Sequence, residues 1–118
     1  MGRLSTHVLD TVTGRPAADV AIDLDALQPD GTWRHLKRIT TNADGRTDQP
    51  LLVGEAFKVG TYMLTFHLGA YFKGHGVATD EPAFLDVVPL RFSVADADGD
   101  YHVPLLATPW SYSTYRGS

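Results

Sequence analysis

The chain has 118 residues, a formal net charge of -4 at pH 7 and no cysteine. This length is typical of a single domain, here residues 1–118, with a core that needs neither disulfide nor metal. The lack of cysteine excludes thiolate metal sites. The acidic balance and dispersed lysines and arginines argue against a nucleic-acid partner.

Six segments alternate apolar and polar residues with the period of two that marks half-buried β-strands. In chain order they are Leu4–Leu9, Val20–Leu27, Thr32–Thr40, Gly60–Leu68, Val87–Val94 and Tyr101–Ala107. The alternation lapses over Gly69–His75, where we expect one or two helical turns, and a last strand follows around Ser111, Ser113 and Tyr115. Short strands separated by Gly- and Asp-rich turns predict an all-β sandwich.

The alternation also predicts which side chains leave the core. If Val8, Val103 and Leu105 point into the sandwich, then His7 and His102 point out of it. The same outer surface would carry Leu9, Pro104 and Leu106. A partly apolar outer surface usually packs against a partner. Histidine transfers protons near neutral pH, so His7 and His102 are candidate catalytic residues.

Other candidates have ordinary interpretations. His35, His67 and His75 lie on polar or Gly-rich segments, as surface histidines do, and an isolated Arg46 would be a solvated turn residue. No histidine or carboxylate pair has the spacing of metal ligands. A Ser-His-Asp triad has little support, because no Gly-x-Ser-x-Gly motif is present and strand geometry points Asp10 away from His7.

No apolar stretch is long enough to cross a bilayer, so we expect no membrane partner. The first residues contain one arginine and no apolar segment of the kind found in signal peptides. We therefore expect a cytoplasmic protein, although a signal removed during maturation would leave the same sequence.

Two motifs carry a family resemblance that extends over essentially the whole chain. The chain opens with Ser5-Thr6-His7-Val8-Leu9-Asp10 and ends with Tyr115-Arg116-Gly117-Ser118. Together these motifs resemble the 5-hydroxyisourate hydrolases, the transthyretin-related enzymes of urate breakdown. The resemblance implies catalytic roles for His7, Arg46 and His102. It implies substrate-binding roles for Tyr115, Arg116, Gly117 and Ser118.

The resemblance further implies a transthyretin-like β-sandwich of two four-stranded sheets with one short helix. It implies a homotetramer, a dimer of dimers, with sites at the subunit interface, a small purine-derived substrate and no cofactor. Two local features depart from the family pattern: Trp110-Ser111 replaces a Tyr and a smaller residue, and the turn before His102 is unusually acidic, with Asp96, Asp98 and Asp100. The alternative is a transthyretin-type ligand carrier or another β-sandwich binding module, since fold alone does not define function.

Overall fold

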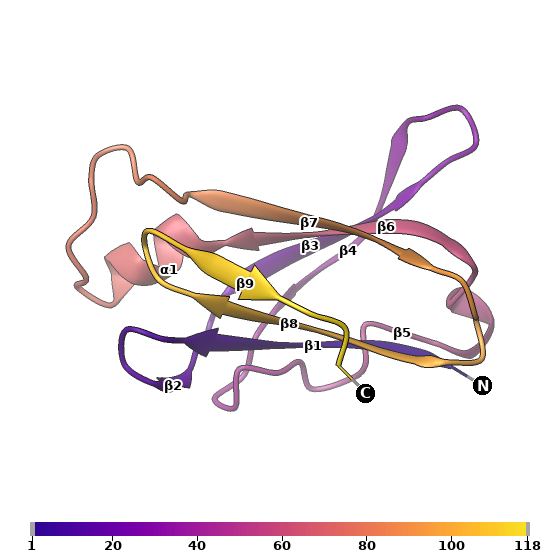
Figure 1. Ribbon diagram of the computed structural model, residues 1–118, viewed down its shortest axis with the longest axis horizontal. Helices are drawn as coiled ribbons and strands as arrows, with labels where there is room; N and C mark the ends of the chain where they lie inside the picture. Colours follow the sequence, from indigo (N-terminus) through magenta and orange to yellow (C-terminus); the bar gives the residue numbers. More distant parts are fainter. Residues whose placement is uncertain (1, 118) are drawn as a thin grey trace.

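The computed structural model describes residues 2–117 and contains two β-sheets with one short α-helix (Figure 1). One sheet has the strand order β2-β1-β8-β9, with β5 also paired to β1. Its strands are β1 (Arg3–Asp10), β2 (Arg15–Pro16), β5 (Leu52–Val53), β8 (Asp100–Ala107) and β9 (Tyr112–Thr114). The other sheet has the order β4-β3-β6-β7. Its strands are β3 (Ala21–Leu27), β4 (Trp33–Thr40), β6 (Gly60–His67) and β7 (Val87–Val94).

The predicted sandwich is confirmed, with small differences at its margins. All six predicted strands form within one residue or so of their expected ends, and helix α1 spans Leu68–Gly74 where the alternation lapses. The first sheet has five strands rather than four, because β2 and β5 each add a two-residue pairing to β1. A single 3-10 turn, η1 (Gly54–Ala56), follows β5, and β9 is shorter than the last predicted strand. Within residues 2–117 no helix is long and apolar enough to cross a membrane.

The core lies between the two sheets and is built from the inward residues that the alternation predicted. Val8, Leu105 and Leu64 have no exposed surface, and Phe66 is equally buried. Burying an apolar side chain of this size stabilises the fold by about 1.5–3 kcal/mol. The outward residues of β1 and β8 are consequently fixed as well, since neighbouring residues on a strand face opposite sides.

The strands β1 and β8 are parallel neighbours in the centre of their sheet. Their register pairs Ser5 with His102, His7 with Pro104, and Leu9 with Leu106. The outer surface of the β1–β8 pair is therefore polar at the end that carries Ser5 and His102, and apolar at the end that carries Leu9 and Leu106. One expected residue differs in exposure: Pro104 lies on this outer surface but is buried within the chain, whereas His102 and Leu106 beside it are half-buried.

A buried polar contact fixes the end of β1 to helix α1. The Tyr71 hydroxyl donates to Asp10 Oδ2 over 2.8 Å, and Asp10 Oδ1 accepts the backbone N–H groups of Val12 and Thr13. Burial, and then the contact with Asp10, raise the pKa of Tyr71 well above its ordinary value. Asp10 thus points into the protein, away from His7, as the strand geometry predicted.

Candidate active site

The two outward histidines lie close together on the outer surface of the β1–β8 pair. The ring centroids of His7 and His102 are 6.4 Å apart, with an angle of 42° between the ring planes. Both side chains are half-buried, so each ring is held by its surroundings and still reaches solvent. Two imidazoles at this separation can both contact one small planar molecule.

Arg46 reaches this surface through the turn that follows β4. Asn42 closes the turn. Its side-chain oxygen accepts hydrogen bonds from the backbone N–H groups of Asp44 and Arg46. Its backbone N–H donates to the Arg46 carbonyl over 2.7 Å. The Gly45 carbonyl accepts the Val8 N–H over 2.8 Å, which docks the turn onto β1.

Gly45 is required here for two reasons. Its φ of +73° lies in the left-handed region, and a Cβ atom would collide with the Val8 carbonyl oxygen. The docked turn pairs Arg46 with His7 in an isolated β-bridge. The Asp44-Gly45 turn thus places Arg46 beside the histidine pair, close enough for its charge to act on both rings.

His102 has further contacts on two sides. Ser5 Oγ lies 2.8 Å from His102 Nδ1. Gly117 forms an isolated bridge with His102, and its N–H donates to the His102 carbonyl over 2.7 Å. The chain tail therefore runs along His102, and Gly117 belongs to the site through its backbone.

The electrostatic surroundings favour neutral imidazoles. Burial lowers the pKa of His7 below its ordinary value of 6.5, and the Arg46 charge lowers it further. A hydrogen bond to the Asp44 backbone and the Asp44 charge raise the pKa of His7, but these two effects are smaller and the pKa stays below its ordinary value. Burial, Arg46 and then His7 likewise lower the pKa of His102. Near pH 7 both rings are therefore neutral and available to accept a proton.

The acidic turn before β8 does not contribute to these shifts. The Asp96 carboxylate accepts a hydrogen bond from the Asp98 backbone N–H within the turn. Asp100 Oδ1 lies 3.7 Å from Arg3 Nε at the rim of the site. The causes of the His102 shift include none of these carboxylates. The acidity of the turn is thus a feature of the rim of the site.

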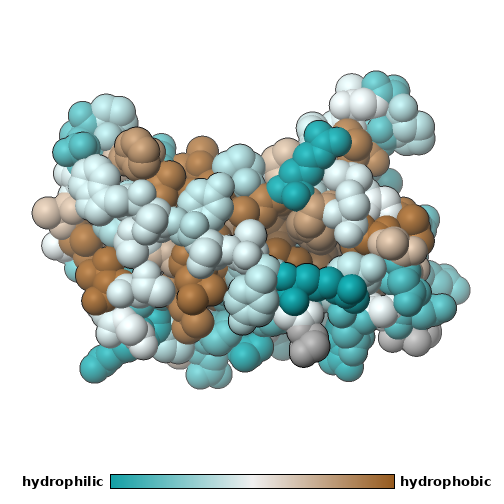
Figure 2. All heavy atoms as spheres, viewed as in Figure 1, coloured by the Kyte–Doolittle hydropathy of each residue, from teal (hydrophilic) through white to brown (hydrophobic). Residues whose placement is uncertain are grey.

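Two hollows lie on either side of Tyr101. A hollow of about 300 Å³ is lined by Arg3, Ser5, Arg46, Asp100, Tyr101 and His102. A groove of about 380 Å³ lies between β7 and the β8–β9 pair. Its lining includes Leu90, Phe92 and Val103, and hydrophobic residues are visible in this band in Figure 2.

The tail residues are divided between these two places. Tyr115 and Arg116 line the groove, and the Arg116 guanidinium lies 4.0 Å from the centre of the Tyr101 ring. Gly117 lies against His102, and Ser118 is outside the described residues. Within one chain the structure thus brings together His7, Arg46, His102 and Gly117, while the Tyr115 and Arg116 side chains line the neighbouring groove.

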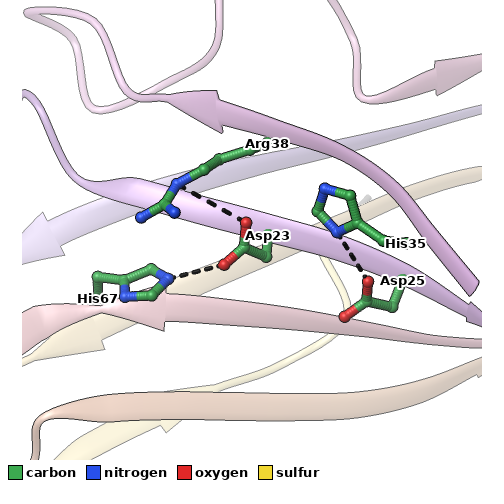
Figure 3. A network of polar contacts seen from close by, with 5 residues as sticks. All are labelled: Asp23, Asp25, His35, Arg38 and His67. Atoms are coloured by element: carbon green, nitrogen blue, oxygen red, sulfur yellow. Dashed lines mark hydrogen bonds and ion pairs between the residues drawn. The ribbon is translucent and has the colours of Figure 1, made fainter. Parts of the chain in front are cut away.

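The remaining histidines make ordinary hydrogen bonds away from this site. On the outer face of the other sheet, His67 Nε2 lies 2.8 Å from Asp23 Oδ2 and His35 Nδ1 lies 3.0 Å from Asp25 Oδ1 (Figure 3). His75 Nδ1 lies 2.9 Å from the Tyr71 carbonyl. Among residues 2–117 no three histidine, aspartate or glutamate side chains gather as metal ligands do.

Sequence reasoning missed Ser5 as a site residue. The alternation on β1 placed Ser5 on the same face as His7, which was the available signal. Its contact with His102 depends on the pairing of β1 with β8, which joins residues 97 positions apart. No local pattern reports such a pairing.

Comparison with known proteins places the chain in a family. A sequence model of the HIUase/Transthyretin family matches residues 4–117. The chain is 59% identical to "5-hydroxyisourate hydrolase 2" of Rhizobium meliloti, over 99% of this chain and 97% of that protein. The chain belongs to the HIUase/Transthyretin family.

Solved structures agree with this assignment. An (S)-allantoin synthase structure superposes with a TM-score of 0.94 at 47% identity, and the match covers 99% of this chain but 44% of that longer chain. Sea bream transthyretin in complex with thyroxine superposes with a TM-score of 0.86 at 30% identity, covering 98% of this chain and 94% of that chain. The transthyretin-like fold predicted from the sequence is therefore confirmed.

Proposed function

We propose that this protein is an enzyme that hydrolyses 5-hydroxyisourate to 2-oxo-4-hydroxy-4-carboxy-5-ureidoimidazoline in urate degradation. Full-length similarity to a 5-hydroxyisourate hydrolase supports this function. The single structural observation that carries it is the gathering of His7, Arg46 and His102 on one outer surface, beside Gly117 of the chain tail. The reaction needs these chemical groups: proton transfer for water and stabilisation of a developing oxyanion.

The roles follow from the chemistry of each side chain. Water attacks a ring carbonyl of the substrate, and an amide-like C–N bond opens. His7 and His102 activate the water and move the proton to the departing nitrogen, because both are neutral near pH 7. Arg46 binds substrate oxygens with its planar guanidinium and stabilises the negative charge. Tyr115, Arg116, Gly117 and Ser118 bind the substrate, with Gly117 at the histidine pair and Tyr115 and Arg116 in the neighbouring groove.

The working form is a homotetramer, a dimer of dimers, with the active site at a subunit interface. Sea bream transthyretin, a structural relative of this chain, is solved in complex with thyroxine, a small molecule. In the single chain β9 lies at a sheet edge, and the neighbouring side chains Trp110, Tyr112 and Tyr115 are 51%, 43% and 60% exposed. Removing apolar surface from water is worth about 25 cal/mol per Å², and closed symmetric contacts are the usual way to do so.

A carrier function is the alternative, favoured by the similarity to transthyretin bound to thyroxine. Two neutral imidazoles beside a guanidinium favour the enzyme, because they supply the proton transfer and charge stabilisation that hydrolysis needs. The two functions differ in one measurement: a carrier binds its ligand unchanged, whereas an enzyme turns it over.

The test is the decay of freshly generated 5-hydroxyisourate, followed by ultraviolet absorbance with and without the protein. We expect the protein to accelerate the decay in proportion to its concentration. Equal decay rates would contradict the function. Sedimentation in the same buffer should give a mass near four chains, and a fully active monomer would contradict the shared site.

A further inference from the structure

The Ser5 hydroxyl is placed to act on His102 by the pairing of two strands. Ser5 and His102 are register partners in the parallel β1–β8 pair, so their side chains emerge side by side on the outer surface. Ser5 Oγ lies 2.8 Å from His102 Nδ1, a normal hydrogen-bond length, and both residues are half-buried. Among the described residues, this is the side-chain hydrogen bond that the His102 ring makes.

The opposite edge of the same ring is packed by the chain tail. A Cβ atom at Gly117 would lie 2.8 Å from His102 Cδ2 and 3.2 Å from His102 Cβ, so the Gly117 backbone occupies that side. Turning the ring over would exchange Nδ1 with Cδ2 and break the Ser5 bond. The ring is therefore held from two sides, and Nε2 is the nitrogen left for a substrate or water.

We propose that Ser5 is a positioning residue that accepts the Nδ1–H of His102 and thereby keeps the lone pair on Nε2. This inference rests on the proposed hydrolase function and refines it by naming the atom that takes the proton. As water attacks the ring carbonyl, a bond forms between the water oxygen and that carbon, and Nε2 takes the proton. Nε2 then returns the proton to the departing ring nitrogen as the C–N bond breaks.

The direction of the Ser5 hydrogen bond follows from this cycle. The Nδ1–H group exists in this neutral tautomer and in the protonated ring, so a serine that accepts from it keeps the bond throughout. A serine that donated to Nδ1 would leave the proton on Nε2 and lose its bond when the ring became charged. A hydroxyl also differs from the carboxylates that contact His35 and His67 on the other sheet, because it orients the ring without adding negative charge.

Kinetics of two Ser5 variants test the role. Ser5→Ala should lower kcat about tenfold and leave KM within about twofold, because the variant loses a hydrogen bond that orients the His102 ring for proton transfer and loses no contact with the substrate. Ser5→Thr keeps the hydroxyl and should keep kcat within about threefold of wild type. Thr61→Ala on the other sheet is the matched control. It removes a hydroxyl on β6 whose oxygen lies 3.0 Å from Ser93 Oγ on β7, and it should leave kcat unchanged. Wild-type kcat in Ser5→Ala would overturn the proposal.

Nitrogen-15 NMR of the histidine rings supplies a readout that does not depend on activity. His102 signals are assigned by their loss in His102→Asn. At pH 8 the wild-type protein should show a protonated Nδ1 and an unprotonated Nε2, and Ser5→Ala should shift both signals toward the average of the two tautomers. A proton on Nε2 in the wild type, or identical His102 signals in both proteins, would overturn the assignment. If the wild type fails to hydrolyse 5-hydroxyisourate, the proposed function fails, while the NMR result still decides whether Ser5 fixes the tautomer.

Discussion

The Gly117 backbone rests directly on the His102 imidazole. The Gly117 N–H donates to the His102 carbonyl over 2.7 Å, and a Cβ at position 117 would approach His102 Cδ2 to 2.8 Å. Real Cβ atoms do not approach other atoms this closely, so the tail and the imidazole fit together because residue 117 has no side chain. This contact joins the tail of the chain to the candidate proton-transfer group.

Replacing Gly117 should therefore impair activity more than stability. In Gly117→Ala the tail or the His102 ring must move, and a displacement of a few tenths of an ångström weakens catalytic alignment. We expect kcat to fall at least tenfold while the melting temperature changes by only a few degrees, since the residue is outside the core. Hydroxyisourate assays and circular dichroism measure the two quantities. Gly2→Ala, which crowds the backbone carbonyl oxygens of Ala97 and Gly99 instead of the His102 side chain, is the comparison for crowding away from the histidines. Full activity in Gly117→Ala would show that the contact is dispensable.

Each of the two histidines should be needed for turnover and dispensable for folding. His7→Asn and His102→Asn remove proton transfer from an outward side chain, so we expect kcat to fall about a hundredfold or more. His35→Asn, on the outer face of the other sheet, is the matched control and should retain wild-type kcat. Near-wild-type turnover in either site variant would remove that histidine from the mechanism.

The pH dependence of turnover follows from the lowered pKa values. Burial and the Arg46 charge lower the pKa of both His7 and His102 below 6.5, so the neutral rings persist to lower pH than ordinary histidines. The rate of the free enzyme should be constant near neutrality and should fall with a midpoint below pH 6.5. Plots of kcat/KM against pH measure this midpoint. A midpoint at or above 6.5 would contradict the lowered pKa values of the two histidines.

The lowered pKa values of His7 and His102 also predict how the free energy of unfolding changes with pH. Well above pH 6.5 the two rings are neutral in both the folded and the unfolded chain, so they contribute nothing there to the pH dependence of unfolding. Below pH 6.5 the unfolded chain takes up protons first, so His7 and His102 lower the free energy of unfolding as the pH falls toward their folded pKa values. The variant with both His7→Asn and His102→Asn should lose less stability between pH 7 and pH 5 than the wild type in thermal melts. A larger loss in the double variant would reverse the sign and contradict the shifts.

The buried contact between Tyr71 and Asp10 should matter for stability and leave catalysis intact. Tyr71→Phe leaves Asp10 Oδ2 without its hydroxyl donor, which should lower the free energy of unfolding by about 1–3 kcal/mol. Urea unfolding monitored by fluorescence measures this change. Because Asp10 points away from His7 on the same strand, kcat of the folded variant should equal that of the wild type. A variant as stable as the wild type, or one that folds fully but turns over slowly, would contradict this separation.

The sequence by itself determined the strands, the sandwich and the outward direction of His7 and His102. These features depend on local alternation, in which each residue's neighbours decide whether it faces the core. The motifs around His7 and at Tyr115-Arg116-Gly117-Ser118 also determined the family, which the comparisons confirm.

The tertiary structure alone decided which of these residues meet. The parallel pairing of β1 with β8 places Ser5 beside His102, although 97 positions separate them. Docking of the Gly45 turn onto Val8 brings Arg46 to the histidines, and the tail divides, with Gly117 at His102 and Arg116 over Tyr101. Such contacts depend on packing between distant segments around a shared core. The alternation of residues within one strand does not predict which other strand it will pair with.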